Sequence, residues 1–209
     1  MLEFFKAGGL LMWPLYACSI IAFGIIAERF WSLQVQRISP ADLMPKIWKW
    51  LKHDQVDANH IKMLQDNSPL GQILAAGLLN RDASRDITKE SIEDTGRHVT
   101  LQLERNLNTL GTIAAITPLL GLLGTVIGMI KVFAVITTEG VGNPETLAGG
   151  ISEALITTAM GLTVAIPSLI FYRLFRGKIN ALVVDMEQKS IQLIEILHGE
   201  RGPVPKKDD

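Results

Sequence analysis

Residues 106–130 read NLNTLGTIAAITPLLGLLGTVIGMI and lie between Arg105 and Lys131 without a single charged side chain. A helix needs roughly 20 mainly apolar residues to cross the ~30 Å hydrocarbon layer of a bilayer. The stretch reaches that length, so it predicts a transmembrane helix. This prediction decides the fold class, because a chain that spans lipid must satisfy its backbone hydrogen bonds within helices or a closed barrel.

Two further stretches have the same character. Residues 7–27 carry no charge, and residues 146–172 carry only Glu153. The three stretches together predict an all-α integral membrane protein with three transmembrane helices. The alternative is a soluble protein with three buried core helices, but such helices are usually shorter and keep one polar face.

The first stretch could also be a cleaved signal peptide, which has a short apolar core followed by a small-x-small cleavage site. Here the apolar run is longer and ends in Glu28-Arg29-Phe30-Trp31, a charged and aromatic boundary. Such a boundary is typical of a membrane interface. We therefore expect the segment to be retained as an anchor.

Basic residues predict the orientation. Eleven Lys and Arg residues lie between Glu28 and Arg105 and seven from Arg173 onward, but none lies between Thr137 and Gly149. By the positive-inside rule, the chain is expected to have its N-terminus outside and its C-terminus inside. The predicted order is a periplasmic N-terminus (1–7), transmembrane helix 1 (8–27), a cytoplasmic helical domain (28–105), transmembrane helix 2 (106–136), a periplasmic loop (137–149), transmembrane helix 3 (150–172), and a cytoplasmic C-terminal helix and tail (173–209).

Composition excludes several classes of protein. The 209 residues, at 23.0 kDa, are too few for a large multidomain enzyme, and the formal net charge of -1 lacks the basic surplus of a nucleic-acid binder. One cysteine excludes a disulfide framework. The four histidines show no ligand spacing, and no nucleophile–base arrangement can be argued. We therefore expect no metal site, no cofactor, no nucleic-acid partner and no enzymatic activity.

The predicted cytoplasmic parts are helical. Ser39-Pro40 and Ser68-Pro69 each resemble a helix N-cap followed by proline at the first helical position. An apolar stripe from Ile87 to Leu110 predicts a helix that continues without a break into transmembrane helix 2. A second stripe, from Phe175 to Leu197, predicts a helix that packs against other helices and ends at His198-Gly199.

Glu153 is the residue with the clearest functional chemistry. A carboxylate inside a membrane helix costs roughly 2.5 to 3.5 kcal/mol on insertion scales, so it usually faces a bundle interior or a wet cavity. The structural alternative is a residue in the first helical turn that complements the helix dipole near the outer surface. A helix start at Asn143-Pro144 would instead place Glu153 in the helix interior.

Hydroxyl and small side chains accompany Glu153. Threonines on the second and third helices can order water and support proton hopping, although each can also simply bond its own helix backbone. Gly121, Gly124 and Gly128 let membrane helices approach closely. Pro118 and Pro167 each free a backbone carbonyl inside the membrane.

Two motifs resemble those of the ExbB/TolQ/MotA proton-channel family. Residues 117–130, TPLLGLLGTVIGMI, resemble the second-helix motif, and residues 150–167, GISEALITTAMGLTVAIP, resemble the third-helix motif. The resemblance covers essentially the whole chain, although MotA has a fourth membrane helix and a longer chain. Lys131 is not part of the motif, and we leave open whether it is an interface anchor or the partner of an acidic group.

The resemblance implies a proton pathway along Glu153, Thr125 and Thr158, with Thr157 and Thr117 as further lining candidates. It implies a homopentameric ring in the bacterial inner membrane whose pore holds the single-span helices of an ExbD- or TolR-like subunit. It also implies a role as channel-wall subunit that couples the proton motive force to a TonB-like protein and transport across the outer membrane. The alternatives are a TolQ-type subunit that energises a TolA-like protein for envelope integrity, or a non-conducting membrane scaffold.

Overall fold

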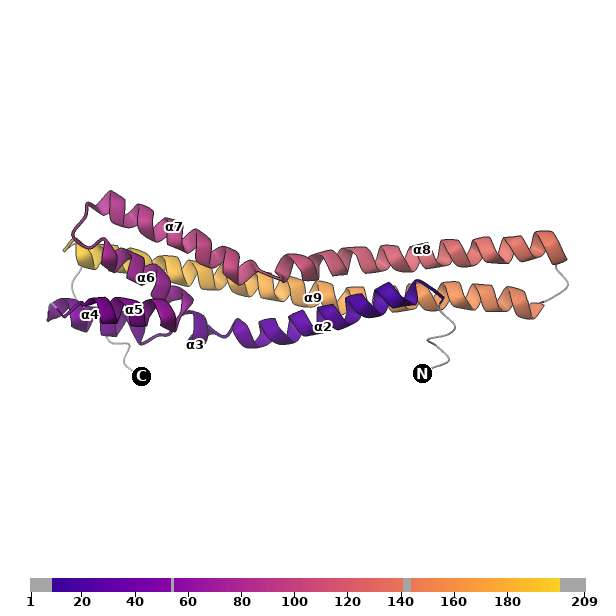
Figure 1. Cartoon of the computed structure of the whole chain (residues 1–209), viewed down its shortest axis with the longest axis horizontal. Helices are drawn as coiled ribbons and strands as arrows, with labels where there is room; N and C mark the ends of the chain where they lie inside the picture. Colours follow the sequence, from indigo (N-terminus) through magenta and orange to yellow (C-terminus); the bar gives the residue numbers. More distant parts are fainter. Residues whose placement is uncertain (1–8, 54, 141–143, 200–209) are drawn as a thin grey trace. The chain divides into compact units, whose positions relative to one another are not determined.

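The computed structural model describes residues 9–53, 55–140 and 144–199, and all regular secondary structure within these ranges is helical (Figure 1). The predicted N-terminal segment 1–7 lies outside the described residues, as do residues 141–143 of the predicted periplasmic loop and residues 200–209 of the predicted tail. The helices are α2 (Met12–Ser32), α3 (Val35–Ile38), α4 (Leu43–Lys52), α5 (Ala58–Asn67), α6 (Pro69–Leu79), α7 (Arg85–Glu104), α8 (Leu107–Glu139) and α9 (Pro144–Leu197).

Contacts divide the chain into two compact units. The first consists of Met1–Arg29 and Asn106–Phe175, and the second of Phe30–Arg105 and Arg176–Asp209. We call them the apolar unit and the charged unit. Helix α9 contributes to both, because it continues through the boundary at Phe175.

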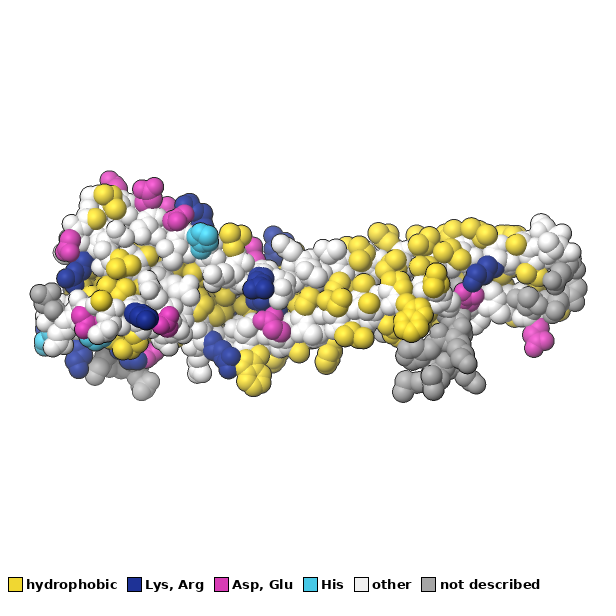
Figure 2. All heavy atoms as spheres, viewed as in Figure 1, with side chains coloured by type: hydrophobic (Ala, Val, Ile, Leu, Met, Phe, Trp, Pro, Cys, Tyr) yellow, Lys and Arg dark blue, Asp and Glu magenta, His cyan; other side chains and the backbone are white. Residues whose placement is uncertain are grey.

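The apolar unit displays large hydrophobic side chains on its surface (Figure 2). Trp13 of α2 is 77% exposed, and Leu119 of α8 is 63% exposed. Within the described ranges, three helices are long and apolar enough to cross a membrane: α2, α8 and the long α9. An apolar surface of this extent suits contact with lipid rather than water. The all-helical prediction with three membrane-length helices is thus confirmed, while the predicted bilayer boundaries and orientation stay predictions.

The charged unit buries its apolar side chains in a core formed by several short helices and the C-terminal part of α9. Contacts join α5 to α6, α6 to α7, and α3 to α6. The predicted stripe on the C-terminal helix is buried at Ile179, Leu182, Met186 and Leu193. The helix ends at Leu197, and Gly199 follows with a φ of 74°. The predicted packing helix and its end are confirmed.

The two serine–proline pairs behave differently. Ser68 caps α6 as predicted: its Oγ accepts a hydrogen bond from the Gly71 N–H at 3.1 Å, and Pro69 is the first helical residue. Ser39 is not an N-cap, because it ends α3, and α4 begins only at Leu43.

Ser39 instead joins a polar cluster of the charged unit. Its hydroxyl donates to Asp185 Oδ2 on α9, and Lys189 Nζ donates to Ser39 Oγ at 2.7 Å and to Asp185 Oδ2 at 2.8 Å. The Ser39 side chain is buried, and its distant partner explains the failed prediction: a hydroxyl used 146 residues away cannot be assigned from local sequence.

The prediction of an unbroken helix from Ile87 into the second apolar stretch is wrong. Helix α7 ends at Glu104, and α8 begins at Leu107. Between them, Asn106 has a φ of 59° and a ψ of -17°, the left-handed conformation that interrupts a right-handed helix. Asparagine adopts this conformation more readily than other residues with a side chain, because its short amide can hydrogen-bond locally.

Candidate ion-pathway residues

Glu153 lies well inside α9, which begins at Pro144. The alternative of a first-turn residue that complements the helix dipole is therefore excluded. The side chain of Glu153 is 25% exposed. It is thus a mostly buried carboxylate in the interior of an apolar helix, the kind of position at which a charge needs a partner or a wet cavity.

The partner is Lys131 of α8. Its Nζ lies 2.7 Å from Glu153 Oε1, and the lysine side chain is 54% exposed. The sequence placed Lys131 outside the recognised motif, and its contact with Glu153 resolves the alternative that was left open. The pair spans 22 residues of chain and depends on how α8 and α9 are aligned, which charge patterning alone does not reveal.

Gly9 is a third participant that sequence reasoning missed. It has a φ of +67°, and a Cβ placed there would lie only 2.0 Å from Glu153 Oε1. Any side chain at this position would therefore collide with the carboxylate and would also be strained in the backbone. The segment just before α2, together with α8, thus encloses Glu153.

Helices α8 and α9 meet along a seam of small residues. A Cβ on Gly121 would lie 3.0 Å from Thr158 Cα, one on Gly124 would lie 2.4 Å from Thr157 Cγ2, and one on Gly128 would lie 2.7 Å from Ala154 Cβ. We call this contact the glycine seam. All three glycines are buried, and their register brings Lys131 of α8 to Glu153 of α9.

Gly161 is the tightest backbone contact of the glycine seam. A Cβ there would lie 2.6 Å from the carbonyl oxygen of Thr117 and 3.1 Å from Gly121 Cα. Because both neighbours are backbone atoms, neither can rotate away. The two helices can approach this closely only where side chains are absent, as in other membrane helix pairs with small residues at the interface.

The threonines divide by what their hydroxyls bind. Thr158 Oγ1 donates across the seam to the Gly121 carbonyl at 2.8 Å, so it joins α9 to α8. Thr157 Oγ1 donates to the Glu153 carbonyl at 2.8 Å, and Thr117 Oγ1 donates to Ile113 at 2.9 Å. Thr125 Oγ1 donates to Leu122 at 2.6 Å. The last three bonds lie within their own helices, whereas the bond of Thr158 joins two helices.

The two prolines do not end their helices. Helix α8 continues through Pro118, which is half-buried, and α9 continues through Pro167, which is exposed. Each proline lacks the N–H that would bond the carbonyl four residues earlier. Each helix therefore carries one carbonyl without its usual backbone donor.

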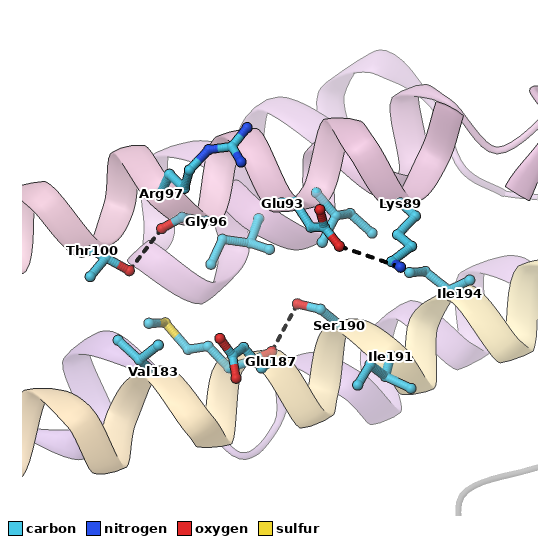
Figure 3. A pocket seen from close by; sticks show the side chains of 13 residues that line it. Lys89, Glu93, Gly96, Arg97, Thr100, Val183, Glu187, Ser190, Ile191 and Ile194 are labelled. Atoms are coloured by element: carbon cyan, nitrogen blue, oxygen red, sulfur yellow. Dashed lines mark hydrogen bonds and ion pairs between the residues drawn. The ribbon is translucent and has the colours of Figure 1, made fainter. Parts of the chain in front are cut away.

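The charged unit holds a groove of about 390 Å³ between α7 and α9 (Figure 3). Apolar side chains such as Ile92 and Ile191 line it, with Lys89, Glu93 and Arg97 of α7 at its edge. None of the predicted pathway residues lines this groove, so its size does not make it the ion site. Among the residues described, no group of three or more His, Cys, Asp or Glu side chains is placed to hold a metal ion.

Comparison with known proteins agrees with the motifs. Residues 65–188 match the MotA/TolQ/ExbB proton channel family. The biopolymer transport protein ExbB-like 1 of Synechocystis is 35% identical over 176 residues, which cover 83% of this chain and 69% of that protein. The biopolymer transport protein exbB1 of Vibrio cholerae is 32% identical over 176 residues, 77% of this chain and 72% of that protein.

A relative with a TolQ name is also similar to this chain. The Tol-Pal system protein TolQ of Haemophilus influenzae is 30% identical over 125 residues, which cover 56% of this chain and 55% of that protein. The matched family region includes α8, the break at Asn106, the glycine seam and Glu153. Both motifs lie inside the matched region, and the chain, with its three membrane-length helices, belongs to the MotA/TolQ/ExbB proton channel family.

Proposed function

We propose that this chain is the channel-wall subunit of an ExbB-type motor in the bacterial inner membrane, and that it transports protons rather than catalysing a reaction. The observation that carries the proposal is Glu153: a mostly buried carboxylate in the interior of an apolar helix, on the same helix as the threonine that bonds across to α8. Charged groups at such positions mark ion routes in membrane proteins.

Thr158 and Thr125 would extend the route from Glu153. Their hydroxyl oxygens keep acceptor capacity after the bonds to Gly121 and Leu122, so each can hold a water molecule that relays a proton. Thr157 and Thr117 offer two further hydroxyls at the seam. Each proton that moves down the membrane potential releases about 2.3 kcal/mol per 100 mV, which is the energy available to the motor.

In this proposal a homopentamer surrounds the single-span helices of an ExbD-like subunit, and an acidic group on that partner takes up and releases the protons. Glu153 of the present chain then forms part of the channel wall. The motor would then act on a TonB-like protein for transport across the outer membrane. Relatives with ExbB-type and TolQ names are both similar to this chain, so the co-purification experiment below is designed to decide the branch.

Proton flux into vesicles tests the role of Glu153. The chain and its ExbD-like partner would be reconstituted in liposomes with an imposed membrane potential, and an internal pH dye would report proton entry. We expect Glu153→Gln to abolish the flux. The matched control is Glu145→Gln, which removes an exposed carboxylate of the same helix and should leave the flux intact. Full flux in an assembled Glu153→Gln complex would show that Glu153 does not carry the protons.

Co-purification tests the branch. The full chain, extracted in mild detergent from its own membranes, should bring down an ExbD-like and a TonB-like protein, identified by mass spectrometry. Recovery of TolR-like and TolA-like proteins instead would assign the chain to the TolQ type. The same preparation, measured by native mass spectrometry, should give five copies of this chain; any other copy number would contradict the pentamer.

A further inference from the structure

The carboxylate of Glu153 is in contact with two other elements. Lys131 Nζ of α8 lies 2.7 Å from Oε1, and Gly9 leaves no room for a side chain above the same oxygen. The ion pair and the backbone contact both involve Oε1. The carboxylate is therefore held at one defined place between α8 and the segment before α2.

The surrounding sequence makes this ion pair unusual. Lys131 is the first charged residue after the run 106–130, and Glu153 is the only charge in residues 146–172. Two opposite charges in apolar segments attract strongly, because a medium of low dielectric constant screens them less than water does. An isolated charge there would be costly, so each group stabilises the other.

We propose that Lys131 is a positioning residue for Glu153: its ammonium group holds the carboxylate against α8, beneath Gly9, and the carboxylate becomes available to another group only when this ion pair opens. The effect on ion flow rests on the proposed function. The positioning of the carboxylate by Lys131 does not depend on it. The alternative role of Lys131, an anchor that extends to lipid headgroups, would leave its ammonium away from Glu153.

The reactivity of Glu153 toward dicyclohexylcarbodiimide tests the proposal. This apolar reagent enters membranes and modifies protonated carboxyl groups that are free to react. Membranes that contain the full chain would be treated briefly, and mass spectrometry of the digested protein would give the labelled fraction at Glu153. The unlabelled peptide that contains Glu153 is measured in the same digest and serves as the internal reference.

We expect Lys131→Met to raise the ratio of labelled to unlabelled Glu153 peptide by roughly two- to fivefold, the range that loss of a partly exposed ion pair produces. Lys131→Arg retains the positive charge and should keep the ratio near that of the unmodified chain. An unchanged ratio in Lys131→Met would overturn the proposal. An equal rise in the Met and Arg variants would also overturn it, because side-chain packing rather than charge would then protect Glu153.

Gly9→Ala provides a second, independent variant. The added methyl group would displace the carboxylate from beneath the N-terminal segment and should raise the same labelling ratio. Gly149→Ala is its control, since a Cβ at Gly149 meets nothing within 4 Å. Equal ratios in the two glycine variants would contradict the part of the proposal that concerns Gly9.

The proposal and the proposed function can fail separately. If Glu153→Gln leaves proton flux intact while Lys131→Met still raises labelling, the positioning role stands and the channel role is wrong. If Glu153→Gln abolishes flux but Lys131→Met leaves labelling unchanged, the channel role stands and the positioning role is wrong. With both roles intact, Lys131→Met should change flux whereas Lys131→Arg should preserve it.

Discussion

Helix α9 packs against its neighbours with different kinds of side chain in the two units. In the apolar unit, its residues facing α8 are small or hydroxylated, as at Ala154, Thr158 and Gly161. In the charged unit, its buried residues are large, as at Ile179 and Leu193. Water drives large apolar side chains together, but lipid does not, since lipid is as apolar as they are. In lipid, close backbone contact and hydrogen bonds must hold the helices together.

The comparison predicts that substitutions that enlarge a side chain reduce the stability of the apolar unit most. Gly161→Leu should destabilise the folded chain by about 3 kcal/mol or more, because its Cβ meets backbone atoms of Thr117 and Gly121 that cannot give way. Thermal unfolding in detergent, followed by circular dichroism, measures the effect. Gly149→Leu adds the same atoms to open space on the same helix and should stay near the parent. Similar midpoints for both variants would mean that the glycine seam is not tight.

Substitutions that shorten a buried side chain should reduce the stability of the charged unit. Leu193 is fully buried, and its Cδ2 lies 3.0 Å from the place where a Cβ on Gly77 would stand. Leu193→Ala should therefore leave a cavity and cost about 3 kcal/mol. Denaturant unfolding followed by tryptophan fluorescence measures the loss. Ile191→Ala, at a neighbouring position that is 54% exposed, should cost much less. If the two variants were equally stable, the core would not extend to Leu193.

The hydrogen bond across the glycine seam should contribute less to stability than the close packing of the two helices does. Thr158→Val keeps the volume but removes the bond to the Gly121 carbonyl, and we expect a cost of about 0.6 kcal/mol, the average for such bonds between membrane helices. The shift of the thermal midpoint in detergent measures it. Thr163→Val is the control, because Thr163 donates only to Ala159 of its own helix. A larger loss in the control would contradict the importance of the cross-helix bond.

The smallest expected effect is a pH dependence of the charged unit. Burial raises the pKa of Asp185, but the hydrogen bonds from Lys189 and Ser39 together lower it by more than burial raises it. The pKa in the folded state therefore lies below the ordinary value of 3.8. A lowered folded pKa adds stability above the unfolded value, and this stability is lost as the pH falls through the folded pKa. The effect is small because the Asp185 side chain is 41% exposed and therefore screened.

Thermal midpoints at neutral pH and at about pH 3 test this sign. The parent chain should lose more stability between the two conditions than Asp185→Asn does, since the variant has no carboxylate to protonate there. The other carboxylates titrate in both proteins, so only the difference between them reports on Asp185. An identical loss in both would show that the cluster with Ser39 does not stabilise the ionised form.

The sequence predicted the features that depend on composition and local pattern. Long runs with at most one charge predicted the three long apolar helices, Ser68-Pro69 predicted the start of α6, and the motif around Glu153 indicated the family. Each of these follows from residues within a single segment. The break at Asn106 was missed because no glycine or proline marks it, and an asparagine in a helical stripe does not show its φ.

Features that depend on the alignment of distant segments could not be predicted. The pairing of Lys131 with Glu153 depends on which turn of α8 faces which turn of α9, and that register is set by the contact of Gly128 with Ala154. The position of Gly9 over the carboxylate depends on the path of the chain before α2. Neither register nor path leaves a periodic pattern in the sequence.

The cluster of Ser39 with Asp185 has a consequence for biosynthesis. Its two ends are 146 residues apart, and all of α8 and the part of α9 that belongs to the apolar unit lie between them in the chain. At about 5 to 20 residues per second, the ribosome needs roughly 7 to 30 s to go from one end to the other. During that interval, the α9 residues that complete the core of helices α3 to α7 are not yet present. The charged unit is therefore completed only after α8 and the first part of α9 have been synthesised, so its final folding follows their synthesis.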